Sequence, residues 1–172
     1  MAYSTVKKIG DVLHWEYAKL LSDDTSPVVR NFLELKSGTR RCTAAVFEDL
    51  DLGPARCAYC SNQEDLSPDT LVPDRGCIGS EAHNTVQVCR GCKAAKGDQD
   101  LLDWWGIDRL NELHPVVRRK YLRMLYLCHE CRGLLGHDVR HGSPDLSDLA
   151  QVFKQPCFSF LSKTARDAAR LE

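Results

Sequence analysis

Four cysteines in the middle of the chain have the spacing of a metal site. They form two pairs with two residues between the members of each pair, and the segment 61–88 separates the pairs. One such pair can chelate an ion from a tight turn, and two pairs complete the tetrahedral sulfur shell that favours zinc. Both pairs stand among turn-forming residues rather than on an apolar stripe, which argues against four thiols buried only for packing. The sequence therefore predicts one structural zinc ion with four ligands: Cys57, Cys60, Cys89 and Cys92.

A third pair, Cys128 and Cys131, allows two interpretations. His137 and His141 follow it and could complete a second site of two cysteines and two histidines. Both cysteines, however, fall on the apolar stripe of an expected helix over 115–135, where free cysteine packs well. We favour packing, and a measured content of two zinc ions per chain would favour the metal site instead. The remaining cysteines have no partner at a ligand spacing: Cys42 and Cys157 are expected in the core and Cys77 in a loop.

The stretch 57–105 resembles the HNH nuclease family. That family's motif has a cysteine pair, an Asp-His followed by an apolar residue and a proline, and a glycine-containing loop. An asparagine with an apolar strand follows, and then Cys-x-x-Cys-Asn and Lys-Gly. The resemblance implies a ββα-metal core, in which a hairpin carries the loop and a helix begins near the last cysteine. The matching positions are Cys57, Cys60, Asp69, Pro73, Gly76, Asn84, Cys89, Cys92, Lys96 and Gly97.

Two positions that carry the family's chemistry differ in this chain. The histidine that acts as general base aligns with Thr70, whose hydroxyl cannot accept a proton near neutral pH. The last residue of the motif, an Asn or His ligand of the catalytic magnesium, aligns with Lys93, whose ammonium has no lone pair for a metal. Asp69 is retained. His83, beside Asn84, is the candidate for a relocated base, and a solvent-exposed loop histidine is the simpler interpretation. The resemblance thus implies a catalytic set that is vestigial.

Three cations surround the start of the expected motif helix, in a stretch, 84–97, that contains no acid. A helix N-terminus favours anions through its free amides and its dipole. Within an HNH-like frame we therefore expect Arg90, Lys93 and Lys96 to contact nucleic-acid phosphates, with Lys93 where an active enzyme would hold magnesium. The alternative is a solvated basic turn. A second basic cluster contains Arg118, Arg119, Lys120 and Arg123.

Hydrophobic periodicity predicts helices on both sides of this core. The expected fold class is α+β, with a zinc-stabilised ββα-metal (HNH-like) core in 54–105. N-terminal helices in 1–53 and C-terminal helices in 106–172 are expected to wrap it. The expected helices cover 11–22, 27–38, 43–52, 100–113, 115–135 and 143–153, with a polar helical tail at 162–172.

Composition limits the functions that this chain can have. The net charge of −1 and pI near 6.6 exclude a uniformly basic surface, so nucleic-acid binding must come from a local patch. Nine cysteines without a secretion signal indicate metal ligands or buried thiols rather than a disulfide framework. No apolar run approaches the roughly 18 residues of a membrane helix, which predicts a cytoplasmic protein.

These features favour a nucleic-acid-binding, catalytically degenerate HNH-like protein. We expect DNA in preference to RNA as the ligand, although the residues themselves leave the two open. The resemblance implies a place in a larger bacterial or phage assembly. One alternative is an active endonuclease that uses an unusual base such as His83 and would need Mg²⁺ or Mn²⁺. A second alternative is a zinc-stabilised protein-interaction module, which the near-neutral charge and the adjacent Trp104 and Trp105 suggest.

Overall fold

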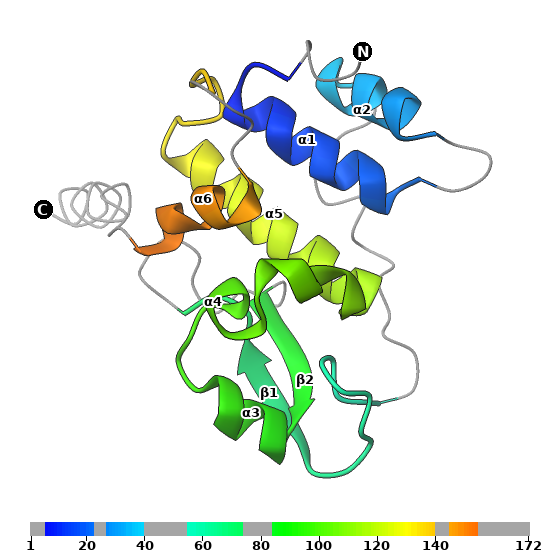
Figure 1. Cartoon of the computed structure of the whole chain (residues 1–172), viewed down its shortest axis with the longest axis vertical. Coiled ribbons are helices and arrows are strands. Elements are labelled where there is room, and N and C mark those ends of the chain that lie inside the picture. Colours follow the sequence, from blue (N-terminus) through cyan, green and yellow to red (C-terminus); the bar gives the residue numbers. More distant parts are fainter. Residues whose placement is uncertain (1–5, 23–26, 40–54, 74–83, 140–144, 155–172) are drawn as a thin grey trace, which may run out of the picture.

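The computed structural model describes residues 6–22, 27–39, 55–73, 84–139 and 145–154. Within these ranges the chain combines helices with one two-stranded antiparallel sheet, which is an α+β fold as expected. Figure 1 shows the N-terminal helices at one end of the molecule and the sheet at the other. The helix expected over 43–52 and the tail at 162–172 lie outside the described residues.

The N-terminal helices are α1 (Ile9–Leu20) and α2 (Val28–Lys36). Helix α1 buries an apolar face that includes Leu13 and Tyr17. Its first turn is held by Asp11, whose carboxylate accepts hydrogen bonds from the backbone of Lys7 and Lys8 at 3.0 and 3.1 Å. The same carboxylate pairs with Lys36 at 2.8 Å and so ties the end of α2 to the start of α1.

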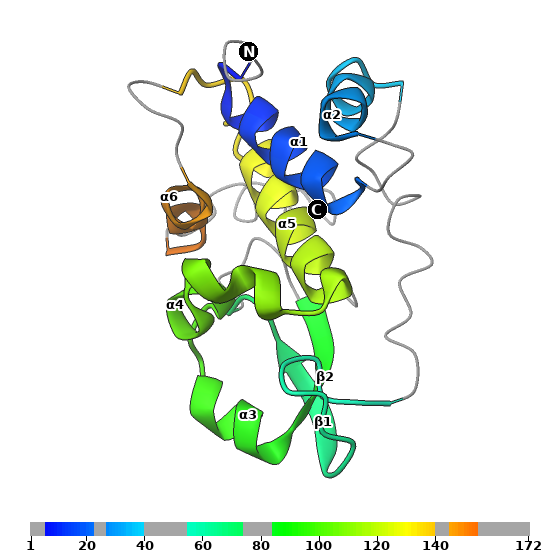
Figure 2. The ribbon, with the colours of Figure 1, turned by 45° about the vertical axis from the view of Figure 1, so that its right-hand side comes forward.

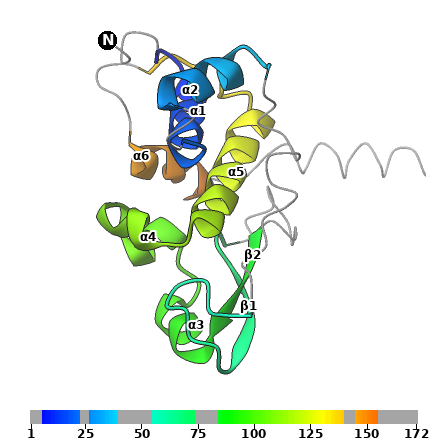
Figure 3. The same ribbon diagram turned by 90° about the vertical axis from the view of Figure 1, so that its right-hand side faces the viewer.

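Helix α5 (Pro115–Cys131) begins near the sheet and ends beside the N-terminal helices, as Figures 1 and 3 show. His114 caps it by accepting a hydrogen bond from the Val116 amide. The helix ends four residues earlier than expected, because Gly133 adopts a positive φ of 69° that stops helical geometry. Cys128 is buried as predicted, but Cys131, the last residue of the helix, is exposed, so the packing prediction is wrong for Cys131.

The sheet is a hairpin of β1 (Leu66–Thr70) and β2 (Thr85–Cys89), and α3 (Arg90–Lys96) follows β2 directly. Figure 2 shows α3 beside β1. The continuous helix expected over 100–113 is wrong. Gly106, at φ 87°, ends α4 (Leu101–Trp105), and the 3-10 helix η4 (Ile107–Glu112) takes up the remainder.

A single cluster of buried residues draws on the N-terminal helices, the hairpin and the C-terminal helices. The last of these are α6 (Leu146–Ala150) and the 3-10 helix η5 (Gln151–Lys154). Two side chains of α5 also bridge the parts. Arg119 donates to the Leu20 carbonyl at 3.0 Å, and Lys120 donates to the Thr85 carbonyl at 2.8 Å. The hairpin therefore rests on a scaffold that α5 holds in place.

Two histidines on the helical scaffold predict a loss of stability in mild acid. Burial lowers the pKa of both His14 and His129, and the Nδ1 atom of each is buried without a hydrogen-bond partner. The unfolded chain therefore gains protons first as the pH falls below about 6.5. As the pH falls further, each histidine should lower the free energy of unfolding by up to about 1.4 kcal/mol per pH unit. The decrease stops when the pH reaches the pKa of that histidine in the folded protein.

Urea unfolding at pH 7.5 and at pH 5.5 measures this effect. His14→Phe keeps a ring to stack on Tyr126, whose centroid lies 5.8 Å away, and removes one titrating group. Comparison with the parent chain cancels any proton uptake by the cysteines. We expect a smaller difference between the two pH values in His14→Phe. An unchanged difference would show that His14 does not titrate as a buried group.

Candidate metal centre and adjoining hairpin

The structure brings the four predicted ligands together from three elements. Cys57 and Cys60 lie in the turn before β1, Cys89 ends β2, and Cys92 lies in α3. Their four Sγ atoms lie within 4.8 Å of one another, and those of Cys60 and Cys89 are 3.6 Å apart. Zn–S bonds of about 2.3 Å in a tetrahedron place sulfurs about 3.8 Å apart. The cluster therefore suits a metal ion of zinc's size and ligand preference.

A tight turn aims the first cysteine pair at the second. The Cys57 amide donates to the Asn62 carbonyl at 2.6 Å, and the Ser61 amide donates to the Cys57 carbonyl at 2.9 Å. Ser61 has a φ of 65°, in the left-handed region that reverses the chain. The Ala58 amide donates to the Gln87 carbonyl at 2.8 Å and so fixes the turn to the outer edge of β2. The two residues between Cys57 and Cys60 therefore form a turn that brings both thiols to the same side.

The thiol pKa values show how closely the four groups are packed. Burial raises the pKa of Cys57, but hydrogen bonds from the backbones of Cys89, Cys60 and Tyr59 overcome burial and lower it to about 7. The pKa of Cys92 is raised by burial and by hydrogen bonds to the other thiols. Four thiolates at this separation repel one another strongly. A divalent cation is the group that would let all four ionise together.

No second metal cluster is present among the residues that the structure describes. The four cysteines are the group found there that brings three or more potential ligand atoms together. Cys131 and His137 are both exposed, and His141 lies outside the described ranges together with Cys42, Cys77 and Cys157. The alternative site at Cys128 and Cys131 thus gains no support from the described part of the chain.

Asp69, the acid that the sequence resemblance implies for a catalytic set, is held in a buried ion pair. Its side chain is 7% exposed, and its carboxylate lies 3.3 Å from the ammonium of Lys96, whose side chain is 1% exposed. The Tyr59 hydroxyl donates to the same oxygen at 3.1 Å. Lys96 also donates to the Thr70 carbonyl at 2.6 Å. Its ammonium is enclosed by the protein, so the predicted contact of Lys96 with a phosphate is wrong for this structure.

Aromatic side chains close the space around this ion pair. The Tyr59 ring packs edge-on against Trp104, with centroids 4.9 Å apart. Burial, together with the charge of Asp69, raises the pKa of Tyr59 well above its usual range, so its hydroxyl remains a donor. Trp105 packs beside them and carries the Arg109 guanidinium over its ring at 4.4 Å. The Tyr59 ring, whose hydroxyl donates to Asp69, is thus packed against both tryptophans.

Both edges of the hairpin are covered by donors from other elements. On β1, Lys93 donates to the Pro68 carbonyl at 2.7 Å and Lys96 donates to Thr70. On β2, the carbonyls of Thr85 and Gln87 accept from Lys120 and from the Ala58 amide. Unpaired edge carbonyls are templates for aggregation, and these bonds remove them. Lys93 is exposed, but its ammonium already donates to the Pro68 carbonyl. Arg90 is exposed at the start of α3.

Asn84 has a structural role at the open end of the hairpin. Its side chain is 1% exposed, accepts from the Val72 amide at 2.9 Å and donates to the Val72 carbonyl at 2.8 Å. The Leu71 amide donates to the Asn84 carbonyl. Thr70 is exposed and pairs with Thr85 across the hairpin. His83 lies outside the described residues, so the structure does not place it relative to Thr70.

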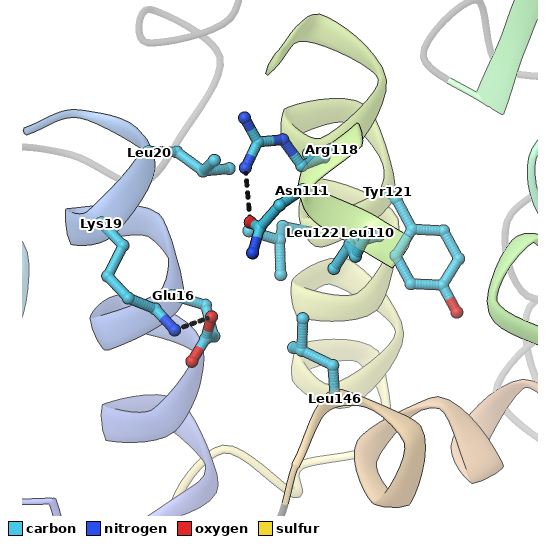
Figure 4. A pocket seen from close by; sticks show the side chains of 9 residues that line it. All are labelled: Glu16, Lys19, Leu20, Leu110, Asn111, Arg118, Tyr121, Leu122 and Leu146. Atoms are coloured by element: carbon cyan, nitrogen blue, oxygen red, sulfur yellow. Dashed lines mark hydrogen bonds and ion pairs between the residues drawn. The ribbon is translucent and has the colours of Figure 1, made fainter. Parts of the chain in front are cut away.

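The second basic cluster, on α5, is bonded within the protein. Arg118 donates to the Asn111 side chain at 3.1 Å, and its neighbours Arg119 and Lys120 hold the backbone contacts already described. Arg118 borders a cleft of about 220 Å³ between α1, η4, α5 and α6, which Figure 4 shows. On its other side Lys19 pairs with Glu16. The charged groups of this cleft are therefore paired with protein atoms.

Comparisons with protein families, with curated proteins and with solved structures found no match. No helix in the described part of the chain is both long enough and apolar enough to cross a membrane.

Proposed function

We propose that this chain is an HNH-like module that binds nucleic acid without cleaving it. The element order hairpin then helix, with a four-cysteine cluster at its base, agrees with the ββα core that the sequence resemblance implies. The observation that carries the proposal is the buried pair of Asp69 and Lys96. Zinc on the cysteines would hold the hairpin and helix in place, and it takes no part in any reaction.

Among the residues that the structure describes, the hairpin offers no centre for hydrolysis. An HNH-like reaction needs a base to activate water and a divalent ion to stabilise the leaving oxygen. The Asp69 carboxylate is neutralised by Lys96, Thr70 supplies only a hydroxyl, and the ammonium of Lys93 lies on the Pro68 carbonyl. Two positive charges, those of Lys93 and Lys96, thus lie along β1. Their repulsion disfavours a second divalent ion.

The exposed part of α3 supplies the contact surface. Arg90 and Lys93 are exposed on this helix, and the stretch 84–97 contains no acid. The bond from Lys93 to the Pro68 carbonyl uses one of its three donors and leaves the others for a phosphate oxygen. Two cations on one short helix predict binding through the backbone of the nucleic acid, without sequence preference.

Fluorescence anisotropy with a labelled DNA duplex at several salt concentrations tests this surface. The double variant Arg90→Ala/Lys93→Ala should bind more weakly and lower the slope of log K against log salt by about two units. The variant Lys7→Ala/Arg30→Ala makes the same charge change on exposed residues of the N-terminal segment and serves as the matched control. Equal losses of DNA affinity in the two variants would show that α3 is not the contact surface. A single-stranded RNA of the same length compares DNA with RNA.

A zinc-stabilised protein-interaction module is the second candidate, and one observation favours it. Lys96 and the α5 cations are bonded within the protein, which leaves a small basic surface on the described part of the hairpin module. Absence of any salt-dependent binding to DNA or RNA would favour this candidate. A larger bacterial or phage assembly and a cytoplasmic location belong to the leading proposal and rest on the resemblance alone.

A further inference from the structure

Asp100 carries a buried carboxylate oxygen that has no partner. Its side chain is 8% exposed. One oxygen, Oδ1, accepts two hydrogen bonds, from the Leu102 amide at 2.9 Å and from the Tyr121 hydroxyl at 2.7 Å. The other oxygen, Oδ2, is buried and accepts none. An unpaired buried carboxylate oxygen is costly, and native proteins rarely keep one without a reason.

The charge of Asp100 is not explained by its place at the start of α4. A helix N-cap needs one acceptor, and asparagine or serine would supply it at no charge. Oδ1 alone performs this task and also accepts from Tyr121. Burial raises the pKa of Asp100, which means that its surroundings disfavour the ionised form. The hydrogen bonds from Tyr121 and Leu102 and the charge of Lys96 favour the carboxylate, but burial outweighs them and Oδ2 is left without a partner.

Asp100 lines a cleft of about 220 Å³ between the start of α4 and η5, which we call the acidic cleft. Two more carboxylates, Asp98 and Asp103, line it, and Lys154 supplies the single cation. The Lys154 ammonium lies 3.1 Å from each oxygen of Asp103. The cleft thus has three carboxylates and one ammonium among its lining residues. One of the carboxylates, Asp103, already binds that ammonium. Its apolar walls come from Pro73, Ala150 and Phe153.

The arrangement of the carboxylates and the apolar walls indicates which kind of cation fits the acidic cleft. In the described residues only the cysteines bring three potential ligand atoms within 4.8 Å of one another, so these carboxylates do not converge on one metal ion. A charged group on an aliphatic stem fits better, because the stem can lie against the apolar walls while the head meets a carboxylate. We propose that the acidic cleft binds an ammonium or guanidinium group on an aliphatic stem, with Asp100 as its inner counter-ion.

Titration with small cations, followed by NMR amide shifts of the zinc-loaded protein, tests this proposal. The probes are the Nα-acetyl methylamides of lysine and arginine, which carry the two side chains of a basic peptide, and putrescine, a free amine. Nα-acetyl-norleucine methylamide keeps a stem without charge, and MgCl₂ at matched ionic strength supplies charge without a stem. The lysine or arginine amide should give saturable shifts at Asp103 and Phe153, whereas the norleucine amide and Mg²⁺ should not.

Asp100→Asn keeps the cap and the size of the side chain and removes the charge. We expect it to weaken binding of the basic probe at least tenfold and to raise the melting temperature of the ligand-free protein, because the unpaired charge is gone. Asp108→Asn, at an exposed acid of η4, is the matched control and should bind as the parent chain does. Tighter binding of putrescine than of either amide would support the cleft as a site for free amines. Binding unchanged in Asp100→Asn, or an equal response to Mg²⁺, would overturn the proposal.

Discussion

Removal of the metal from the four-cysteine cluster should unfold the hairpin module. The turn before β1, the end of β2 and the start of α3 meet at these sulfurs, and Cys57 and Cys89 are themselves buried. Binding of zinc to such sites contributes directly to folding free energy. A loss of about 5 kcal/mol would lower the melting temperature by roughly 15 °C for a chain of this length. Metal analysis should give one zinc per chain, and a chelator should produce the loss.

The cysteine variants make this result specific to the cluster. Replacement of all four ligands by serine should remove the zinc and reproduce the loss of stability. Cys131→Ser changes an exposed cysteine outside the cluster and should leave both zinc content and melting temperature unchanged. Unchanged melting of the quadruple variant would contradict a structural metal. Loss of zinc from Cys131→Ser would restore the second site that we set aside.

Lys96→Met should cost about 3–5 kcal/mol, because it leaves the Asp69 carboxylate buried without its cation. The ammonium is the more deeply buried partner and lies 3.3 Å from the carboxylate. Methionine retains most of the volume of the lysine stem, so packing around it changes little. Urea unfolding of the zinc-loaded variants measures the loss.

A second change on the same pair separates charge from packing. Asp69→Asn with Lys96→Met removes both charges and leaves an amide oxygen that can still accept from Tyr59. This double variant should be more stable than Lys96→Met alone. Lys93→Met changes an exposed lysine one turn away on α3 and should cost about 1 kcal/mol or less. Asp69→Asn alone completes the cycle: if its cost and that of Lys96→Met simply add in the double variant, Asp69 and Lys96 are not coupled.

The four-cysteine cluster could be predicted from the sequence because its signal is local. Each cysteine pair has a fixed spacing within one turn, and the two turns need only meet. The long helix from Pro115 was equally visible, since its apolar stripe repeats over several turns. The break at Gly106 was missed because the residues before and after it, 101–105 and 107–112, both have helical composition. Its positive φ depends on the turn that the fold requires.

The chemistry of the hairpin could not be predicted in the same way. Lys96 was expected on the surface because charged residues in a basic stretch are usually solvated. Its burial depends on Asp69 and Tyr59, which are distant in sequence and reach it only through the register of β1 and β2. The unpaired oxygen of Asp100 likewise has no sequence signal, because an aspartate before a helix is an ordinary cap. Both are properties of tertiary packing.

We propose that the hairpin binds nucleic acid and has lost the means to cleave it. Binding and strand cleavage should be measured in one sample, with supercoiled plasmid, zinc-loaded protein and Mg²⁺ or Mn²⁺. The account predicts a retarded plasmid that remains supercoiled after prolonged incubation. Metal-dependent nicking that is abolished by Asp69→Ala or His83→Ala would contradict it and would establish an active endonuclease with a relocated base.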